Sequence, residues 1–145
     1  MKLFKKAKKG FTLVELVVVI AVIAILAAVS VGAYFGVTDT ANKSAAEQEA
    51  KAFHTNLVLV ANAPENSDVC VLNAKGLDIK GENDIEDVVS LVQAASGSDF
   101  TGYTITFVQD AENGSDDEYD YLSFGHTNGK TVTIDVVTGD IISTL

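Results

Sequence analysis

Residues 11–38 read FTLVELVVVIAVIAILAAVSVGAYFGVT, and Glu15 is the only charged residue among them. From Leu16 to Thr38 it holds 23 residues without a charged side chain. At about 1.5 Å per residue, a helix of this length spans the ~30 Å hydrocarbon core of a membrane. Its many Val and Ile residues favour strand, but a strand this long without polar alternation is implausible. The sequence therefore predicts a transmembrane helix half over residues 11–38.

A short basic leader, residues 1–10, precedes this segment and ends in Gly10. It contains half of the lysines, namely Lys2, Lys5, Lys6, Lys8 and Lys9. The positive-inside rule keeps this cluster in the cytoplasm, so we expect the C-terminal domain on the other side of the membrane. From Phe11 onward the chain keeps five Lys and all twenty acids, a net charge near -15. Such an acidic surface repels phosphate backbones, so direct nucleic-acid binding is not expected.

Glu15 is the unusual residue of the segment, because it places a carboxylate at the start of the apolar run. Charged groups at such positions are costly and usually functional. Two simpler interpretations stay open. The carboxylate could lie at the level of the lipid headgroups, or near the helix N-terminus, where the helix dipole favours an anion.

The residues Lys8-Lys9-Gly10-Phe11-Thr12-Leu13-Val14-Glu15-Leu16 resemble the processing motif of type IV pilins, pseudopilins and competence pilins. The resemblance implies that a prepilin peptidase cuts between Gly10 and Phe11 and that the new amine of Phe11 is methylated. It also implies that the helix is retained and packs with other copies in a filament. The partners implied are further copies of the chain, the prepilin peptidase, and a pilus assembly platform with its ATPase machinery.

The same resemblance gives Glu15 a role in assembly, since its carboxylate would neutralise the Phe11 amine of a neighbouring subunit. An unpaired buried carboxylate is costly, so this pairing would also set the register between subunits. Small residues in the helix allow close helix contact. Many family members have a Pro where this chain has Gly32. Gly32 and Gly36 could soften the helix there, because Gly is a poor helix former.

Two other fates of the N-terminal segment remain open. Val31-Gly32-Ala33 loosely resembles an ordinary signal-peptidase site, and cleavage there would release a soluble domain. Alternatively, the helix could stay in the membrane as the anchor of a monotopic binding domain that never polymerises.

Beyond the membrane segment we expect a globular pilin domain over residues 39–145. Apolar residues continue at helical spacing after the membrane segment, at Ala46, Ala50, Phe53, Leu57 and Val60. They predict that the helix goes on as an amphipathic half until Pro64 ends it, so that one helix runs from Thr12 to Ala63. Residues 64–83 read as a connection with one short strand. Asn83-Asp84-Ile85-Glu86 resembles a capping box opening a second helix, which Gly97 ends.

The C-terminal part has the pattern of strands. Tyr103–Val108 is rich in β-formers, and Tyr119–Phe124 and Lys130–Val137 alternate. Turns are predicted at 126–129 and at 138–140, before Ile141-Ile142. We therefore predict an α+β fold, in which a long N-terminal helix packs on a small C-terminal antiparallel β-sheet of three or four strands.

An acidic loop at 110–118 is a weak candidate calcium site. Its carboxylates at Asp110, Glu112, Asp116 and Asp117 are oxygen ligands of the kind Ca²⁺ prefers. The loop does not follow the EF-hand pattern, and runs of acids are usually only solvated. No other cofactor is expected.

No catalytic motif is recognisable in the sequence, so an enzyme is not expected. Cys70 is the only cysteine, which excludes an intrachain disulfide, and it reads as a small buried residue. His54 reads as a solvated surface residue. We expect a filament subunit, made as a single-pass precursor in the cytoplasmic membrane and assembled into a pilus at the cell surface or a filament facing the periplasm. A major pilin is favoured over a secretion or competence pseudopilin.

Overall fold

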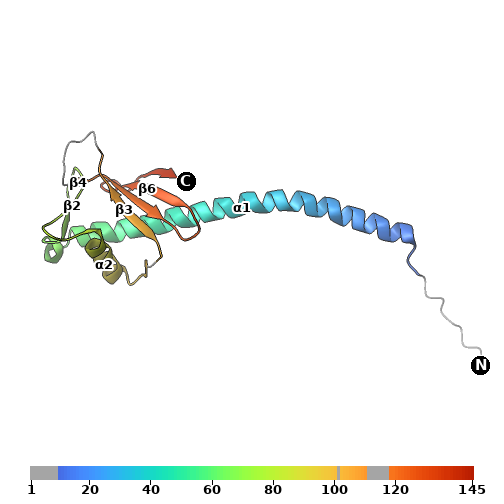
Figure 1. Cartoon of the computed structure of the whole chain (residues 1–145), viewed down its shortest axis with the longest axis horizontal. Coiled ribbons are helices and arrows are strands. Elements are labelled where there is room, and N and C mark those ends of the chain that lie inside the picture. The colour runs from blue at the N-terminus through green and yellow to red at the C-terminus, as the bar shows by residue number, and fades with distance from the viewer. Residues whose placement is uncertain (1–9, 101, 111–117) are drawn as a thin grey trace, which may run out of the picture. The chain divides into compact units, whose positions relative to one another are not determined.

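The structure, a computed structural model, describes residues 10–100, 102–110 and 118–145. The chain divides into two compact units, Met1–Asp39 and Thr40–Leu145, which are described separately. Helix α1 runs without interruption from Leu13 to Ala61. It begins and ends close to the predicted bounds, and Figure 1 shows it with the other elements in chain order.

In the first unit α1 exposes nearly its whole surface, which is apolar. The hydroxyls of Ser30 and Thr38 bond to their own helix: Ser30 Oγ donates to the Leu26 carbonyl at 2.7 Å, and Thr38 Oγ1 donates to that of Tyr34 at 2.8 Å. These polar groups therefore need no water. The helix also continues through Gly32 and Gly36.

In the second unit α1 buries one stripe against the rest of the domain. All five residues predicted for this stripe are buried, namely Ala46, Ala50, Phe53, Leu57 and Val60. The interpretation of His54 as a solvated residue is wrong, because only 9% of it is exposed. His54 follows Ala50 by one helical turn, so it points to the same side as the core residues.

Residues 64–83, predicted as a connection with one short strand, contain more regular structure than expected. A 3₁₀ turn, η1, covers Pro64–Asn66, and two short strands follow, β1 at Cys70–Leu72 and β2 at Leu77–Ile79. The single strand expected here is therefore a hairpin. Each strand has three residues, too few for sequence periodicity to reveal.

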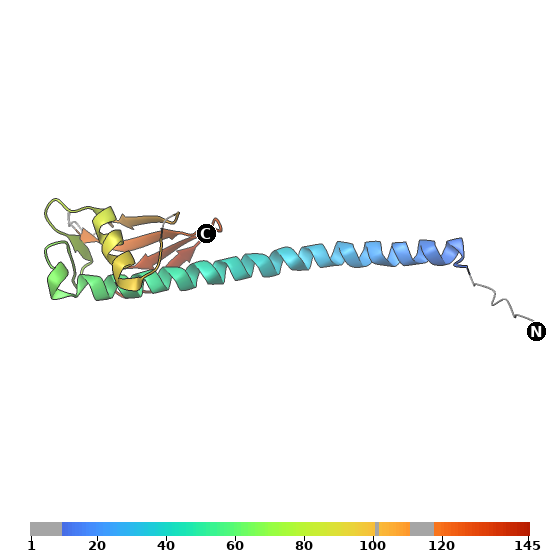
Figure 2. The ribbon, with the colours of Figure 1, turned by 90° about the horizontal axis from the view of Figure 1, so that it is seen from below.

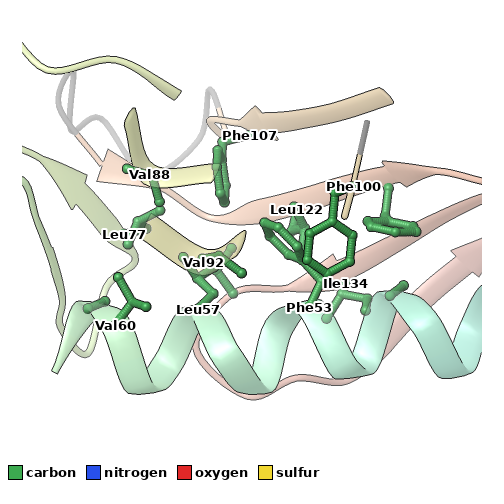
Figure 3. Packing of buried hydrophobic residues seen from close by; sticks show 14 of the residues in the cluster. Phe53, Leu57, Val60, Leu77, Val88, Val92, Phe100, Phe107, Leu122 and Ile134 are labelled. Carbon is green, nitrogen blue, oxygen red and sulfur yellow. The ribbon is translucent and has the colours of Figure 1, made fainter. Parts of the chain in front are cut away.

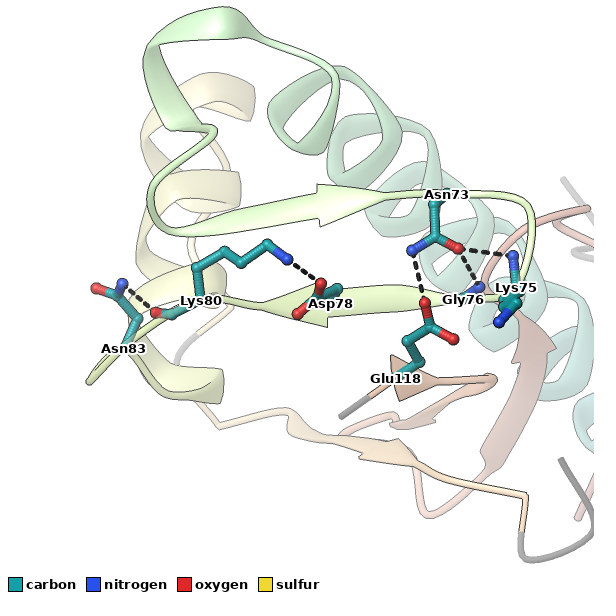
Figure 4. A network of polar contacts seen from close by, with 7 residues as sticks. All are labelled: Asn73, Lys75, Gly76, Asp78, Lys80, Asn83 and Glu118. Carbon is teal, nitrogen blue, oxygen red and sulfur yellow. Dashed lines mark hydrogen bonds and ion pairs between the residues drawn. The ribbon is translucent and has the colours of Figure 1, made fainter. Parts of the chain in front are cut away.

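The loop of this hairpin is held by Asn73, whose Oδ1 accepts from the N–H groups of Lys75 and Gly76 at 2.7 and 3.3 Å. Its Nδ2 donates to Glu118 Oε1 at 2.9 Å (Figure 4). Glu118 begins β4, Glu118–Tyr119, which pairs with β2. The three strands form a sheet in the order β1-β2-β4.

Helix α2 covers Ile85–Ser96 and has a capping box, but one residue later than predicted. The N-cap is Asp84, whose Oδ1 accepts from the Glu86 and Asp87 N–H groups at 2.9 and 3.1 Å. Asp87 Oδ2 accepts from the Asp84 N–H in return. Gly97 ends the helix at φ 66°, as expected of a left-handed cap.

The larger sheet has four antiparallel strands in the order β3-β5-β6-β7. They are Thr104–Val108, Tyr121–Gly125, Thr131–Asp135 and Ile141–Thr144. The alternating segment Tyr119–Phe124, predicted as one strand, is divided between the two sheets. The break falls at Asp120, whose N–H donates to the Val108 carbonyl and whose Oδ2 accepts from the Asp110 N–H.

The core lies between this sheet and the two helices (Figures 2 and 3). Phe53 of α1 is fully buried, and its ring lies 5.1 Å from that of Phe100 and 5.9 Å from that of Phe124 on β5. Val88 and Val92 of α2 and Leu122 of β5 are fully buried in the same cluster. Cys70 is buried there too, as expected. The predicted α+β arrangement is confirmed.

Candidate assembly site

The predicted processing residues lie at the start of α1. Gly10, Phe11 and Thr12 precede the helix, and 85% of Phe11 is exposed. Among the described residues, and apart from the chain neighbours of Gly10, no group lies within 4 Å of the position that a Cβ on Gly10 would take. The backbone on either side of the predicted cut is therefore open to a protease. Residues 1–9, with the predicted lysine cluster, lie outside the described residues.

Glu15 lies in the first turn of α1, where it closes a capping box with Thr12. The Thr12 N–H and Oγ1 each donate to Glu15 Oε2 at 2.8 Å. The Glu15 N–H donates in return to Thr12 Oγ1 at 3.3 Å. Both donors to the carboxylate belong to Thr12, so this local arrangement does not depend on the Gly10–Phe11 bond.

Sequence reasoning did not identify Thr12 as a partner of Glu15. The signal was present, because Thr-x-x-Glu before an apolar run is the pattern of a capping box. In such a box the N-cap hydroxyl and the carboxylate at the third helical position satisfy each other's backbone N–H groups. Of the two simpler interpretations of Glu15, the helix N-terminus is thus the one that the local geometry favours.

The apolar surface behind Glu15 is the largest exposed feature of the first unit. Leu13, Leu16, Ile20 and Ile25 are each at least half exposed. Within the described part of the chain, α1 is long and apolar enough to cross a membrane, and its apolar window is not buried. Water cannot cover so large an apolar surface favourably, so it needs lipid or other protein chains around it.

Of the acidic candidates for calcium, only Asp110 lies within the described residues; Glu112, Asp116 and Asp117 do not. The Asp110 N–H donates to Asp120 Oδ2, and the Tyr121 hydroxyl donates to Asp110 Oδ2 at 3.4 Å. The negative charge of Asp110 raises the pKa of Tyr121, and burial adds to this. Among the described residues no group of three or more His, Cys, Asp or Glu could hold a metal ion. The calcium hypothesis remains a prediction.

A cluster of polar side chains joins the turn between β5 and β6 to α1. Asn128 Nδ2 donates to the Asn42 carbonyl at 2.9 Å, and the Asn128 N–H donates to His126 Nδ1 at 3.0 Å. His126 Nε2 therefore carries the proton in the neutral ring, and it lies 3.2 Å from Glu49 Oε2. The two atoms are close enough for an ion pair, but their geometry is not that of a hydrogen bond. A hydrogen bond to Glu49 also raises the pKa of Tyr103. These contacts are structural, because they hold the sheet to the helix.

Residues 5–31 match the family model described as the prokaryotic N-terminal methylation motif. This match supports a prepilin of the type IV pilin or pseudopilin kind. The match covers residues 5–10 of the basic leader and residues 11–31 of the apolar segment, with Gly10, Phe11 and Glu15 among them. No curated protein and no solved structure matches this prepilin.

The motif and the long apolar helix fit a membrane-anchored precursor. Proteins with this motif are structural subunits rather than enzymes. The motif ends before the globular domain begins, so it carries no information about the surface that this domain presents.

Proposed function

We propose that this prepilin is cleaved after Gly10 and assembles from the membrane, through its N-terminal helix, into a type IV pilus-like filament. The observation that carries the proposal is the apolar half of α1 with one carboxylate at its start. An anchor alone needs the apolar surface and uses the carboxylate only to cap its own helix. A filament subunit uses both, because the helix exchanges lipid for neighbouring helices and the carboxylate meets a charged partner.

The capping box suggests how Glu15 takes part. Both Thr12 donors use Oε2 of the carboxylate, so Oε1 stays available to a further donor. After cleavage, Phe11 carries a positively charged amine. We propose that the Glu15 carboxylate of one subunit, held in its rotamer by its own Thr12, accepts the Phe11 amine of a neighbour. A charge oriented in advance loses less side-chain entropy on pairing.

The proteins implied by this function are a prepilin peptidase, an assembly platform with its ATPase, and further copies of the chain. The precursor would lie in the cytoplasmic membrane, and the filament at the cell surface or facing the periplasm. A major pilin and a pseudopilin differ in where the filament is found, and the location can be measured.

The test is the intact mass and N-terminal sequence of the protein in sheared cell-surface material and in membranes. A chain that begins at methylated Phe11 in the sheared fraction is the expected result. A chain that begins at Phe11 but stays in the membrane favours a pseudopilin. A chain that begins near Tyr34, or that keeps Met1, would contradict processing at Gly10 and favour a secreted or anchored binding domain.

A further inference from the structure

The four-stranded sheet of the second unit has two open edges. Its order places β3 at one edge and β7 at the other. In the described part of the chain, β3 pairs with β5 and β7 pairs with β6, and neither is paired on its outer side. Leu145 exchanges both backbone hydrogen bonds with Thr131 at 2.9 and 3.0 Å. By the alternation of an antiparallel ladder, the N–H and C=O of Thr144 point to the open side.

The two edges share a second property, which is the absence of charge. Thr104–Val108 and Ile141–Thr144 contain only Thr, Ser, Ile, Val and Phe. By contrast, Asp78 lies on β2, Glu118 on β4 and Asp135 on β6. Open edges are normally protected by charged side chains or Pro. The residues of these strands lack that protection, although carboxylates lie beside both: Thr144 Oγ1 of β7 donates to Glu47 Oε1 of α1 at 2.8 Å, and Asp84 and Glu86 line a pocket with Ile105 of β3.

The edges also expose apolar side chains. Val108 on β3 is 43% exposed, and Ile142 on β7 is 58% exposed. Two copies of so acidic a chain repel each other wherever their carboxylates meet. The edge strands add no charge of their own to such a contact, so pairing them brings less repulsion than pairing strands that carry acids. This match of uncharged edge to uncharged edge favours a second copy of the chain as the occupant.

The topology determines how two such edges can join. All neighbouring strands are antiparallel, so β3 and β7, at the ends of a four-stranded order, run in opposite directions. A second copy in the same orientation can place its β3 beside β7 of the first, and the new pair is antiparallel. The contact is head-to-tail, and each added copy again offers a free β7. Head-to-tail contacts of this kind form open filaments or rings, whereas a contact between two β7 strands would close as a dimer.

We propose that β7 of one subunit pairs with β3 of the next, so that the sheets of successive globular domains join edge to edge. This inference rests on the proposed filament function and names the surface through which the globular domains meet. The backbone groups of the two edges supply hydrogen bonds to each other, and the apolar side chains of Val108 and Ile142 become buried.

Cysteine cross-linking tests the pairing directly in filaments from cells that express the full chain. Cys70 is buried, so we expect no background cross-linking from it. Cysteines are introduced on β3 by Thr104→Cys or Thr106→Cys and on β7 by Ile142→Cys or Ser143→Cys. Each β3 cysteine is combined with each β7 cysteine, so that different registers are sampled, from one face of β3 and from both faces of β7. The filaments are oxidised mildly and separated without reductant.

We expect a ladder of disulfide-linked multimers from at least one double variant and monomers from every single variant. Dimers from a single β7 variant would show a closed contact between like edges and overturn the proposal. Filaments that form in every double variant without any cross-link would overturn it as well, while the proposed filament function would stand. If the unaltered chain forms no filament, the proposed function itself fails.

Charge placed on the edges gives an independent measurement. Thr106→Glu on β3 and Ile142→Glu on β7 put a carboxylate into the proposed contact. We expect each to lower the filament yield about fivefold or more, since a like-charged or desolvated group opposite a strand is unfavourable and the contact repeats along the filament. Leu59→Glu is the matched control, because Leu59 is 65% exposed on α1 and lies on neither edge. Equal losses in all three variants would mean a general charge effect and contradict the edge contact.

Discussion

His54 on α1 donates a hydrogen bond from Nε2 to the backbone oxygen of Val136, 2.8 Å away across 82 positions of sequence. Val136 follows β6 directly and is fully buried. A carbonyl in such a place must find a donor within the protein, because water does not reach it. The histidine supplies that donor from the helix and so ties α1 to the turn before β7.

The first prediction concerns this bond. His54→Phe keeps an aromatic side chain but leaves the Val136 carbonyl unpaired, which should lower the free energy of unfolding by about 1–3 kcal/mol. Thr55→Val is the control, because it removes a side-chain hydrogen bond on the same helix that is exposed to water. Urea unfolding followed by far-UV circular dichroism measures both, since the chain has no Trp for fluorescence. Equal effects of the two variants would show that burial of the carbonyl is unimportant.

The second prediction concerns the glycine that packs on the His54 ring. Gly139 has φ +77°, and a Cβ there would lie 2.8 Å from His54 Cε1. Gly139→Ala should therefore carry both a backbone cost of about 1–3 kcal/mol and a steric cost. Gly129→Ala is a matched control, since Gly129 has φ +87° and open space around its Cβ position.

The difference between the two glycine variants measures the contact with the ring. If the ring is the cause, adding His54→Ala to Gly139→Ala should restore part of the loss. Indistinguishable melting curves for Gly139→Ala and Gly129→Ala would argue against a steric clash with His54.

The third prediction separates two roles of Glu15. Glu15→Gln keeps a side-chain acceptor for Thr12 but removes the charge, whereas Glu15→Ala removes both. If the charge pairs with the Phe11 amine of a neighbour, both variants should insert into the membrane and both should fail to form filaments or form them slowly. Filament yield by electron microscopy and the membrane content by immunoblot report the two steps. Normal filaments from Glu15→Gln would mean that the cap, and not the charge, is what assembly needs.

The fourth prediction is the response to alkaline pH. The charge of Asp110 raises the pKa of Tyr121 above its ordinary value of 10.0, and a hydrogen bond to Glu49 raises that of Tyr103. The folded chain therefore holds these protons more tightly than the unfolded chain. The corresponding stability is fully present below pH 10 and is lost as the pH rises through the folded values.

Asp110→Asn removes the main cause of the shift at Tyr121. Ultraviolet absorbance of tyrosinate, compared with a Tyr121→Phe variant to isolate this residue, should show the pKa of Tyr121 moving back toward its ordinary value. An unchanged titration in Asp110→Asn would show that the carboxylate does not act on this hydroxyl.

Much of the fold could be predicted because it depends on local periodicity. The buried stripe of α1 follows from helical spacing, and the Gly97 cap follows from the freedom of glycine at positive φ. The division of Tyr119–Phe124 between two sheets could not be predicted. It depends on Asp120, whose partners Val108 and Asp110 come from an earlier strand and the residues after it.

The candidate site shows the same division. Gly10, Phe11 and Glu15 were identified from a contiguous motif, and their roles remain predictions. The pairing of Glu15 with Thr12 also follows a local pattern, Thr-x-x-Glu, but it was not among the predictions. In contrast, His54 is buried with its partner, the Val136 carbonyl, which lies far away in sequence. The polar residues next to His54 on the helix therefore suggested, wrongly, that its side chain is exposed.

The sequence by itself determined the membrane-length helix, the prepilin motif at its start and the amphipathic continuation up to Pro64. These features depend on residues within a few helical turns of one another, where spacing and polarity carry the physical information. Only the tertiary structure decided which strands lie at the edges of the sheet, and that His54 is a core residue. The physical reason is that strand order and burial arise from contacts between segments distant in the chain, which no local pattern records.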